Sequence, residues 1–170
     1  MLDSKSTCMN DPHMRQVTHW WSQLQRDLGL KRRNEQTELM TYNLTEGQLD
    51  APADVGVIDG LSASLRVALP SDYLDFLRQH NGGEGFIGGN YIIFWKAEEL
   101  AEFNRGYEVE KYAPDILLFG SNGGGEGYGF DIQSAAMPIV RIPFIGMERR
   151  YAIPVAKDFP DLFAKLAIPL

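Results

Sequence analysis

Two glycine-rich segments have spacings that resemble phosphate-binding loops. The segment GEGFIG at 83–88 matches the GxGxxG pattern, in which amides at the start of a helix hold a pyrophosphate. This segment instead follows a predicted helix and precedes a predicted strand. GGGEG at 123–127 lacks the Lys-Ser/Thr pair of a phosphate loop and the spaced aspartates of a calcium loop, so it indicates a wide turn with positive φ at several positions. We therefore expect no cofactor.

The residues that could act as nucleophiles or metal ligands are isolated in the sequence. Ser121 lacks the first glycine of a GxSxG motif, and Cys8 is far in sequence from any group that would activate it. Cys8, His13 and His19 lack the tight pairs of a zinc site. His80 lies on the apolar face of a predicted helix, which favours a hydrogen-bonded histidine at the edge of the core. We expect no catalytic residue, no metal site and no enzymatic activity.

Acidic residues are abundant but do not form an acid–base pair, since neighbours such as Glu98 and Glu99 point in different directions on a helix. The net charge of −7 is unevenly distributed. Residues 34–140 contain five bases and seventeen acids, whereas 1–33 contain six bases and three acids and 141–170 contain five bases and three acids. A segment this acidic repels nucleic acid and attracts a basic protein. A merely solubilising surface is the alternative interpretation.

Length and composition indicate one soluble domain with an N-terminal appendage. The chain has 170 residues, of which 44% are hydrophobic and 23% charged, as in ordinary globular proteins. The single cysteine cannot form an internal disulfide, and no apolar run approaches the ~20 residues of a membrane span. Residues 1–12 are polar, without the apolar core of a secretory signal, and are expected to be disordered. These features predict a cytoplasmic protein that binds neither membrane nor nucleic acid.

Apolar periodicity predicts three helices in the first half of the chain. The first covers 14–28, with a stripe formed by Val17, Trp20, Trp21, Leu24 and Leu28. Residues 34–53 are mostly polar and are interpreted as a connection. The second helix is predicted over 53–67 and the third over 71–80, where Asn81-Gly82 favours a left-handed C-cap.

The second half is predicted to be mainly strands. Residues 91–95 are β-branched and aromatic, and Tyr91 and Trp95 are interpreted as core or sheet-face aromatics rather than a platform for bases. A short acidic helix is predicted over 97–104. The continuously apolar run 116–119 predicts a central strand covered on both faces.

Further strands follow around Tyr128 and Ile139, and Asp158 begins a last helix that ends at Leu166. Loops between the strands are too short for helical crossovers, so the strands should pair antiparallel. The predicted class is α+β: a mainly antiparallel sheet with helices packed against it, plus an N-terminal helix. The predicted domains are a tail over 1–12, a helix and connection over 13–52, and a main domain over 53–170.

The order and spacing of these motifs resemble the SUKH superfamily, which groups bacterial toxin-immunity proteins with fungal cell-wall-synthesis regulators of the Smi/Knr type. The resemblance covers roughly residues 53–168. It rests on LPxxYxxFLxxxNGG, an aromatic strand, a short acidic helix, an apolar-FG-glycine loop, YxFD and a closing helix. The residues that carry it are Leu69, Pro70, Tyr73, Phe76, Leu77, Asn81, Gly82, Gly83, Leu100, Phe119, Gly120, Gly124, Tyr128, Phe130, Asp131 and the stripe of 159–166.

The resemblance implies a non-enzymatic protein-binding domain, in its bacterial branch one that neutralises a toxin. Such toxins are often nucleases or deaminases with basic clefts, which an acidic face would fit. The alternatives are a regulatory scaffold for endogenous signalling or cell-wall-synthesis partners, and a hydrolase or transferase with an unrecognised site around Asp131 and His80. We expect the partner to bind the acidic helix, its flanks and two loops, through Glu84, Glu98, Glu99, Glu102, Tyr107, Glu108, Glu110, Tyr112 and Glu126.

Overall fold

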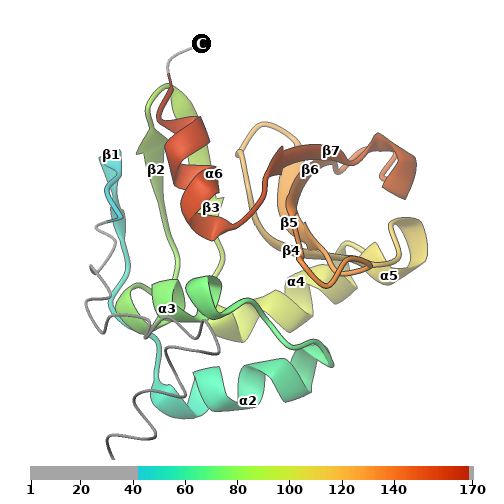
Figure 1. Cartoon of the computed structure of the whole chain (residues 1–170), viewed down its shortest axis with the longest axis horizontal. Coiled ribbons are helices and arrows are strands. Elements are labelled where there is room, and N and C mark those ends of the chain that lie inside the picture. The colour runs from blue at the N-terminus through green and yellow to red at the C-terminus, as the bar shows by residue number, and fades with distance from the viewer. Residues whose placement is uncertain (1–41, 169–170) are drawn as a thin grey trace, which may run out of the picture. The chain divides into compact units, whose positions relative to one another are not determined.

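The structure, a computed structural model, describes residues 42–168 (Figure 1). These residues form a seven-stranded antiparallel sheet in which the strands lie side by side in sequence order, and five α-helices pack around it. The predicted α+β class is confirmed. The helix predicted over 14–28 lies outside the described residues, and the domain boundaries at 12 and 52 stay predictions.

Strands that follow one another in the chain are also neighbours in the sheet, so no connection crosses over another strand. The strands are β1 (Thr45–Leu49), β2 (Gly83–Ile87), β3 (Asn90–Phe94), β4 (Ile116–Ser121), β5 (Glu126–Asp131), β6 (Ile139–Pro143) and β7 (Ile153–Ala156). The helices are α2 (Val55–Leu65), α3 (Ser71–Gln79), α4 (Leu100–Gly106), α5 (Val109–Tyr112) and α6 (Phe159–Leu166), with 3₁₀ turns η1 (Ala97–Glu99) and η2 (Arg149–Tyr151). Every neighbouring strand pair is antiparallel, as predicted from the short loops.

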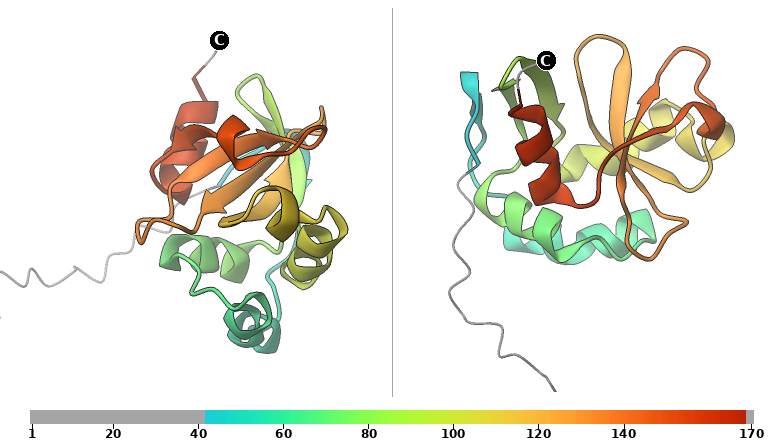
Figure 2. Two further views of the ribbon diagram at one scale, coloured as in Figure 1. Left: turned by 90° about the vertical axis from the view of Figure 1, so that its right-hand side faces the viewer. Right: turned by 45° about the horizontal axis from the view of Figure 1, so that its top comes forward.

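Helices α3 and α6 cover one face of the sheet, which we call the inner face (Figure 2). Phe76 from α3 and Phe159 from α6 are fully buried, with ring centroids 4.9 Å apart. The Asp72 carboxylate joins the two helices, because it accepts a hydrogen bond of 3.0 Å from the amide of Phe159. The buried aromatic neighbours of Phe76 and Phe159 are Tyr42, Tyr73, Phe94, Phe119 and Phe163. Phe130 lies behind them, against Tyr73 and Phe119.

Local capping explains where two of these helices begin. The Asp158 carboxylate accepts from the amide of Asp161 (2.8 Å), which confirms the predicted N-cap of α6. Asp54 accepts from the amide of Gly56 (2.8 Å) at the start of α2. At α3 the N-cap is Pro70, and the Asp72 carboxylate accepts from the amide of Tyr73 (2.8 Å) within the first turn. Carboxylates thus cap the starts of α2 and α6, whereas α3 begins without a side-chain cap.

Helix α4 packs on the opposite face of the sheet, which we call the outer face. The Asn104 side chain accepts from the amide of Leu118 and donates to its carbonyl oxygen, both at 2.8 Å. The two bonds attach the helix to β4 beside an irregularity in the pairing of β4 with β5. All six residues of β4 are buried, which confirms the predicted central strand covered on both faces.

Strands β1, β2 and β7 were not predicted from the sequence. For β2 the reason is its glycines. The GxGxxG segment forms β2, and it holds no helix start. Gly83 has φ +127°, and a Cβ there would lie 2.4 Å from the carbonyl oxygen of Gln48 on β1. This close approach requires glycine. The polar residues 45–49, read as part of a connection, form β1, and β7 contains Pro154 on the sheet edge.

Candidate protein-binding surface

The NGG motif joins α3 to the outer face of the sheet. The Asn81 side chain is buried, accepts from the amide of Ala97 (2.9 Å) and donates to the Glu98 carboxylate (2.8 Å). The predicted left-handed C-cap is wrong, because α3 ends at His80 in an extended conformation (φ −148°, ψ 117°). The positive φ falls further along the chain, at Gly82 (φ +89°), where a Cβ would lie 2.7 Å from the Phe94 carbonyl oxygen. The motif therefore fixes η1 against the end of β3, which places the acidic helix beside the sheet.

A groove lies on the outer face of β1, β2 and β3, beside η1 and α4. Its volume is about 670 Å³. Its side chains include the half-buried Tyr91, Ile93 and Phe103 and the buried Trp95, together with polar and charged groups. The lining residues are Glu46, Gly47, Gln48, Asp50, Gly83, Glu84, Tyr91, Ile93, Phe94, Trp95, Lys96, Glu99 and Phe103.

The charge of the groove is predominantly negative. Four of its residues are acidic and one, Lys96, is basic. The Lys96 ammonium lies 3.6 Å from the Asp50 carboxylate, and the Lys96 amide donates to the Glu99 carboxylate at 3.1 Å. The pKa of Tyr91 is raised, mainly by interaction with the neighbouring Glu84 carboxylate. The groove thus combines aromatic surface with an excess of carboxylates, which suits a cationic ligand group.

The predicted partner-binding residues fall into separate groups. Glu84 and Glu99 line the groove. Tyr107 stacks on Trp95, with ring centroids 5.9 Å apart, and so lies beside the groove. Glu98 is exposed, although its carboxylate also accepts from Asn81, and Glu102 is exposed on α4.

Three predicted residues, Glu108, Glu110 and Tyr112, lie in α5 or directly before it, outside the set that lines the groove. The Lys111 ammonium lies 3.0 Å from both the Glu108 carboxylate and the Tyr112 hydroxyl, and it lowers the pKa of Glu108. Tyr112 is 44% exposed, and Glu110 is exposed. A partner that covered the groove would not need to contact this set.

The Glu126 carboxylate is engaged within the loop between β4 and β5. It accepts from the Asn122 side chain (2.7 Å) and lies 3.3 Å from the Arg141 guanidinium. Asn122 also accepts from the amides of Gly124 and Glu126 (2.9 and 3.0 Å). The predicted wide turn is confirmed, with positive φ at Gly123 and Gly125. These contacts give Glu126 a role in shaping the loop.

Several groove residues were not among the predicted binding residues. Glu46 and Asp50 come from β1 and the residue after it, within the segment predicted to be a connection. Phe103 lies on the predicted acidic helix, and its ring is 4.9 Å from Trp95 in the groove. Tyr91 was predicted to be a core or sheet-face aromatic, and it lies on the open sheet face. The alternation of β3 was the signal that could have identified it.

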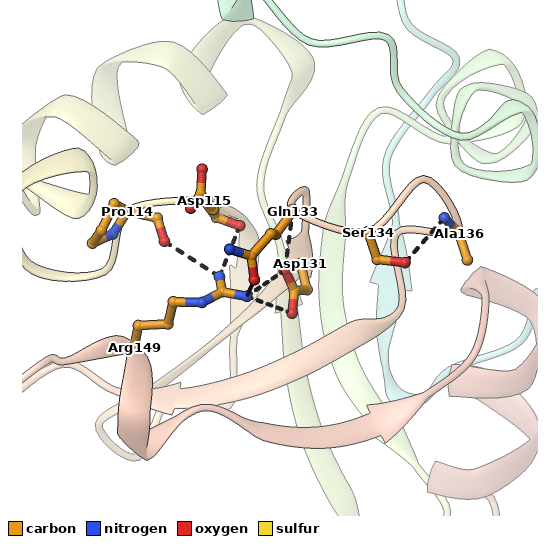
Figure 3. Close-up of polar contacts among 7 residues, drawn as sticks. All are labelled: Pro114, Asp115, Asp131, Gln133, Ser134, Ala136 and Arg149. Carbon is orange, nitrogen blue, oxygen red and sulfur yellow. Dashed lines mark hydrogen bonds and ion pairs between the residues drawn. The ribbon is translucent and has the colours of Figure 1, made fainter.

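Asp131 and His80, around which the alternative enzymatic site was expected, make contacts within the folded domain. The Asp131 carboxylate accepts from one guanidinium nitrogen of Arg149 at 2.7 and 2.8 Å (Figure 3). Arg149 also donates to Gln133 and to the carbonyl oxygens of Pro114 and Asp115, so one side chain joins the loop before β4 to the end of β5.

His80 lies at the edge of the core, as predicted. Its Nδ1 is 3.4 Å from the Asp50 carbonyl oxygen, and its ring makes an edge contact with Tyr42 and a tilted contact with Phe76. Among the residues that the structure describes, no group of three or more His, Cys, Asp or Glu side chains could hold a metal ion. No helix within 42–168 is long and apolar enough to cross a membrane.

Comparison with known proteins agrees with this architecture. No curated protein sequence matches the chain. The sequence profile of the SMI1 / KNR4 family (SUKH-1) matches residues 52–165, which extend from the residue before Ala53 to the last turn of α6. This match covers well over half of the chain and confirms the resemblance seen in the sequence motifs. The chain therefore belongs to the SMI1 / KNR4 family (SUKH-1).

Proposed function

We propose that this protein is an immunity protein that neutralises a basic, nuclease- or deaminase-like toxin domain by binding it, without catalysis. The family fits a non-enzymatic immunity or regulatory domain. One observation of the structure supports the toxin partner in particular. The open groove on the outer face brings aromatic side chains together with four acidic residues.

The groove chemistry suits a protein partner with a basic cleft. Carboxylates around an interface raise the association rate for an oppositely charged partner, and buried aromatics supply most of the binding energy. Toxins that act on nucleic acids carry basic clefts to hold phosphates. A domain that covered such a cleft with carboxylates would block substrate binding.

A tagged pull-down from the source cells, washed at rising salt and read by mass spectrometry, tests this function. We expect one basic, toxin-like protein bound one to one and released at high salt. Capture of the cell's own signalling or envelope proteins, bound independently of salt, would contradict the toxin hypothesis and support a role as a regulatory scaffold.

A matched pair of charge reversals tests the position of the interface. The double variant Glu46→Lys/Glu84→Lys changes two exposed side chains of the groove. The control Glu108→Lys/Glu110→Lys makes the same change in net charge on α5. At low salt, we expect the groove variant to bind the captured protein with an association rate lower by on the order of tenfold, and the control to change it less. A larger effect of the control would move the interface to α5.

A further inference from the structure

Three aromatic rings form a row that continues from the groove across the outer face. Trp95, which lines the groove, lies nearly parallel to Tyr107, with centroids 5.9 Å apart. Tyr107 in turn lies nearly parallel to Phe144, with centroids 4.4 Å apart. The row therefore connects the end of β3, the end of α4 and the residue that follows β6. It gives the acidic groove an apolar extension.

The backbone around the row is held by hydrogen bonds, which limits its movement. The Phe144 amide donates to the carbonyl oxygen of Gly125 (2.9 Å), and a Cβ on Gly127 would lie 3.0 Å from the Phe144 ring. The Tyr107 amide donates to the Phe103 carbonyl (2.9 Å) at the end of α4. Rings that are already ordered lose little conformational entropy when a partner covers them.

Ile145 follows Phe144 directly and is 92% exposed, more than any other large hydrophobic side chain of the described residues. Gly146 follows with φ +68°, so Ile145 stands in a bend of the chain. Tyr107 is itself 42% exposed. An isolated exposed isoleucine needs no explanation, but this one follows directly in the chain after the last ring of an ordered aromatic row that begins at a groove.

We propose that Tyr107, Phe144 and Ile145 form the apolar part of the partner-binding surface, which receives a segment of the protein partner that carries apolar side chains next to basic ones. This rests on the proposed function, because the carboxylates of the groove hold the basic side chains of that same segment. The arrangement is the usual one for a protein interface, with ordered aromatic anchors beside charged groups at the rim.

Two synthetic peptides of equal charge separate the apolar part of this surface from the acidic part. The probes are capped octapeptides in which lysine alternates with leucine or with serine, titrated into the ¹⁵N-labelled full chain at low salt. We expect the lysine–leucine peptide to bind about fivefold more tightly and to shift the amide resonances of Trp95, Tyr107 and Ile145. In the Ile145→Ser variant the ratio of the two affinities should fall towards one. The control variant Ile153→Ser changes a residue of the exposed edge strand β7 and should keep the ratio of the native chain.

Equal affinities of the two peptides for the native chain would overturn the proposal, as would resonance shifts centred on Tyr151 and Ile153. Failure of the proposed function gives a different result. In that case Glu46→Lys/Glu84→Lys would leave the binding of the lysine–serine peptide unchanged, whatever the effect of leucine. Because Ile145 is almost fully exposed, Ile145→Ser should not perturb folding.

Discussion

The two faces of strand β3 show how one short segment serves both stability and binding. Ile92 and Phe94 point to the inner face and are buried, while Tyr91 and Ile93 point to the outer face and remain half-buried in the groove. Phe94 contacts the rings of Phe76 and of α6 residues, whereas Tyr91 contacts the half-buried Phe86 ring (centroids 5.0 Å apart) and lines the groove. The alternation of a strand thus divides a stabilising face from a face that is free to bind.

The largest effect expected from this difference is on the free energy of unfolding. Phe76→Ala removes a fully buried ring with aromatic neighbours at 4.9 to 5.1 Å and should cost about 3–5 kcal/mol. Ile93→Ala, on the groove side, should cost less than about 1.5 kcal/mol, because the side chain is already half exposed. Urea unfolding measures both. Similar losses would mean that the outer face is part of the core.

A smaller effect is expected at the hydrogen bonds that hold α4 on the outer face. Asn104→Ala leaves the amide and carbonyl of the buried Leu118 without their side-chain partner and should cost about 1–3 kcal/mol. Asn122→Ala also removes side-chain bonds to backbone amides, but in a loop exposed to water, so its cost should be lower. Chemical denaturation of the two variants provides the comparison. An equal cost would show that α4 is not held by Asn104.

Two tyrosines on the two faces should respond differently to alkaline pH. Burial, and then Asp72 and Asp75, raises the pKa of Tyr42 to about 12, from 10.0. Between these values the unfolded chain loses this proton and the folded chain keeps it. The stability is therefore full below pH 10 and falls as pH rises towards 12, by on the order of 1 kcal/mol after allowance for solvent screening.

The matched variants place this effect on one face. Tyr42→Phe should make the urea midpoint less dependent on pH above 10, at a small cost in stability at neutral pH. Tyr91→Phe should change the alkaline dependence much less, because Tyr91 lies in the open groove. A larger change for Tyr91→Phe would show that the groove, and not the core, controls alkaline unfolding.

What could be predicted from the sequence follows the same division between the faces. The apolar stripes of α3 and α6 and the apolar run of β4 were predicted correctly, because burial imposes a recognisable pattern of apolar residues on each of them. Strands β1 and β2 have no such pattern. Strand β1 is almost entirely exposed. Strand β2 contains two glycines at positions where a Cβ would lie too close to the backbone of β1.

The residues that line the groove were difficult to predict for the same reason. Glu84 and Glu99 were proposed for their charge alone, whereas Glu46 and Asp50 reach the groove through the pairing of β1 with β2, about forty residues apart in the chain. Such long-range pairing has no local signature when both strands are short and polar. Charge alone therefore could not separate the groove from α5, and the strand topology was needed to do so.

The smallest effect is expected from a polar atom on the inner face. Tyr73 is 1% exposed among aromatic rings, and no hydrogen-bond partner for its hydroxyl lies within the described residues. Burial accordingly raises its pKa. Tyr73→Phe removes the desolvated hydroxyl and keeps the ring, so stability should be unchanged or rise by up to about 1 kcal/mol. Tyr128→Phe is the control, because its hydroxyl interacts with Arg141 and its loss should be unfavourable. Thermal unfolding resolves the sign: a loss of stability in Tyr73→Phe would mean that the hydroxyl has a partner in the folded chain.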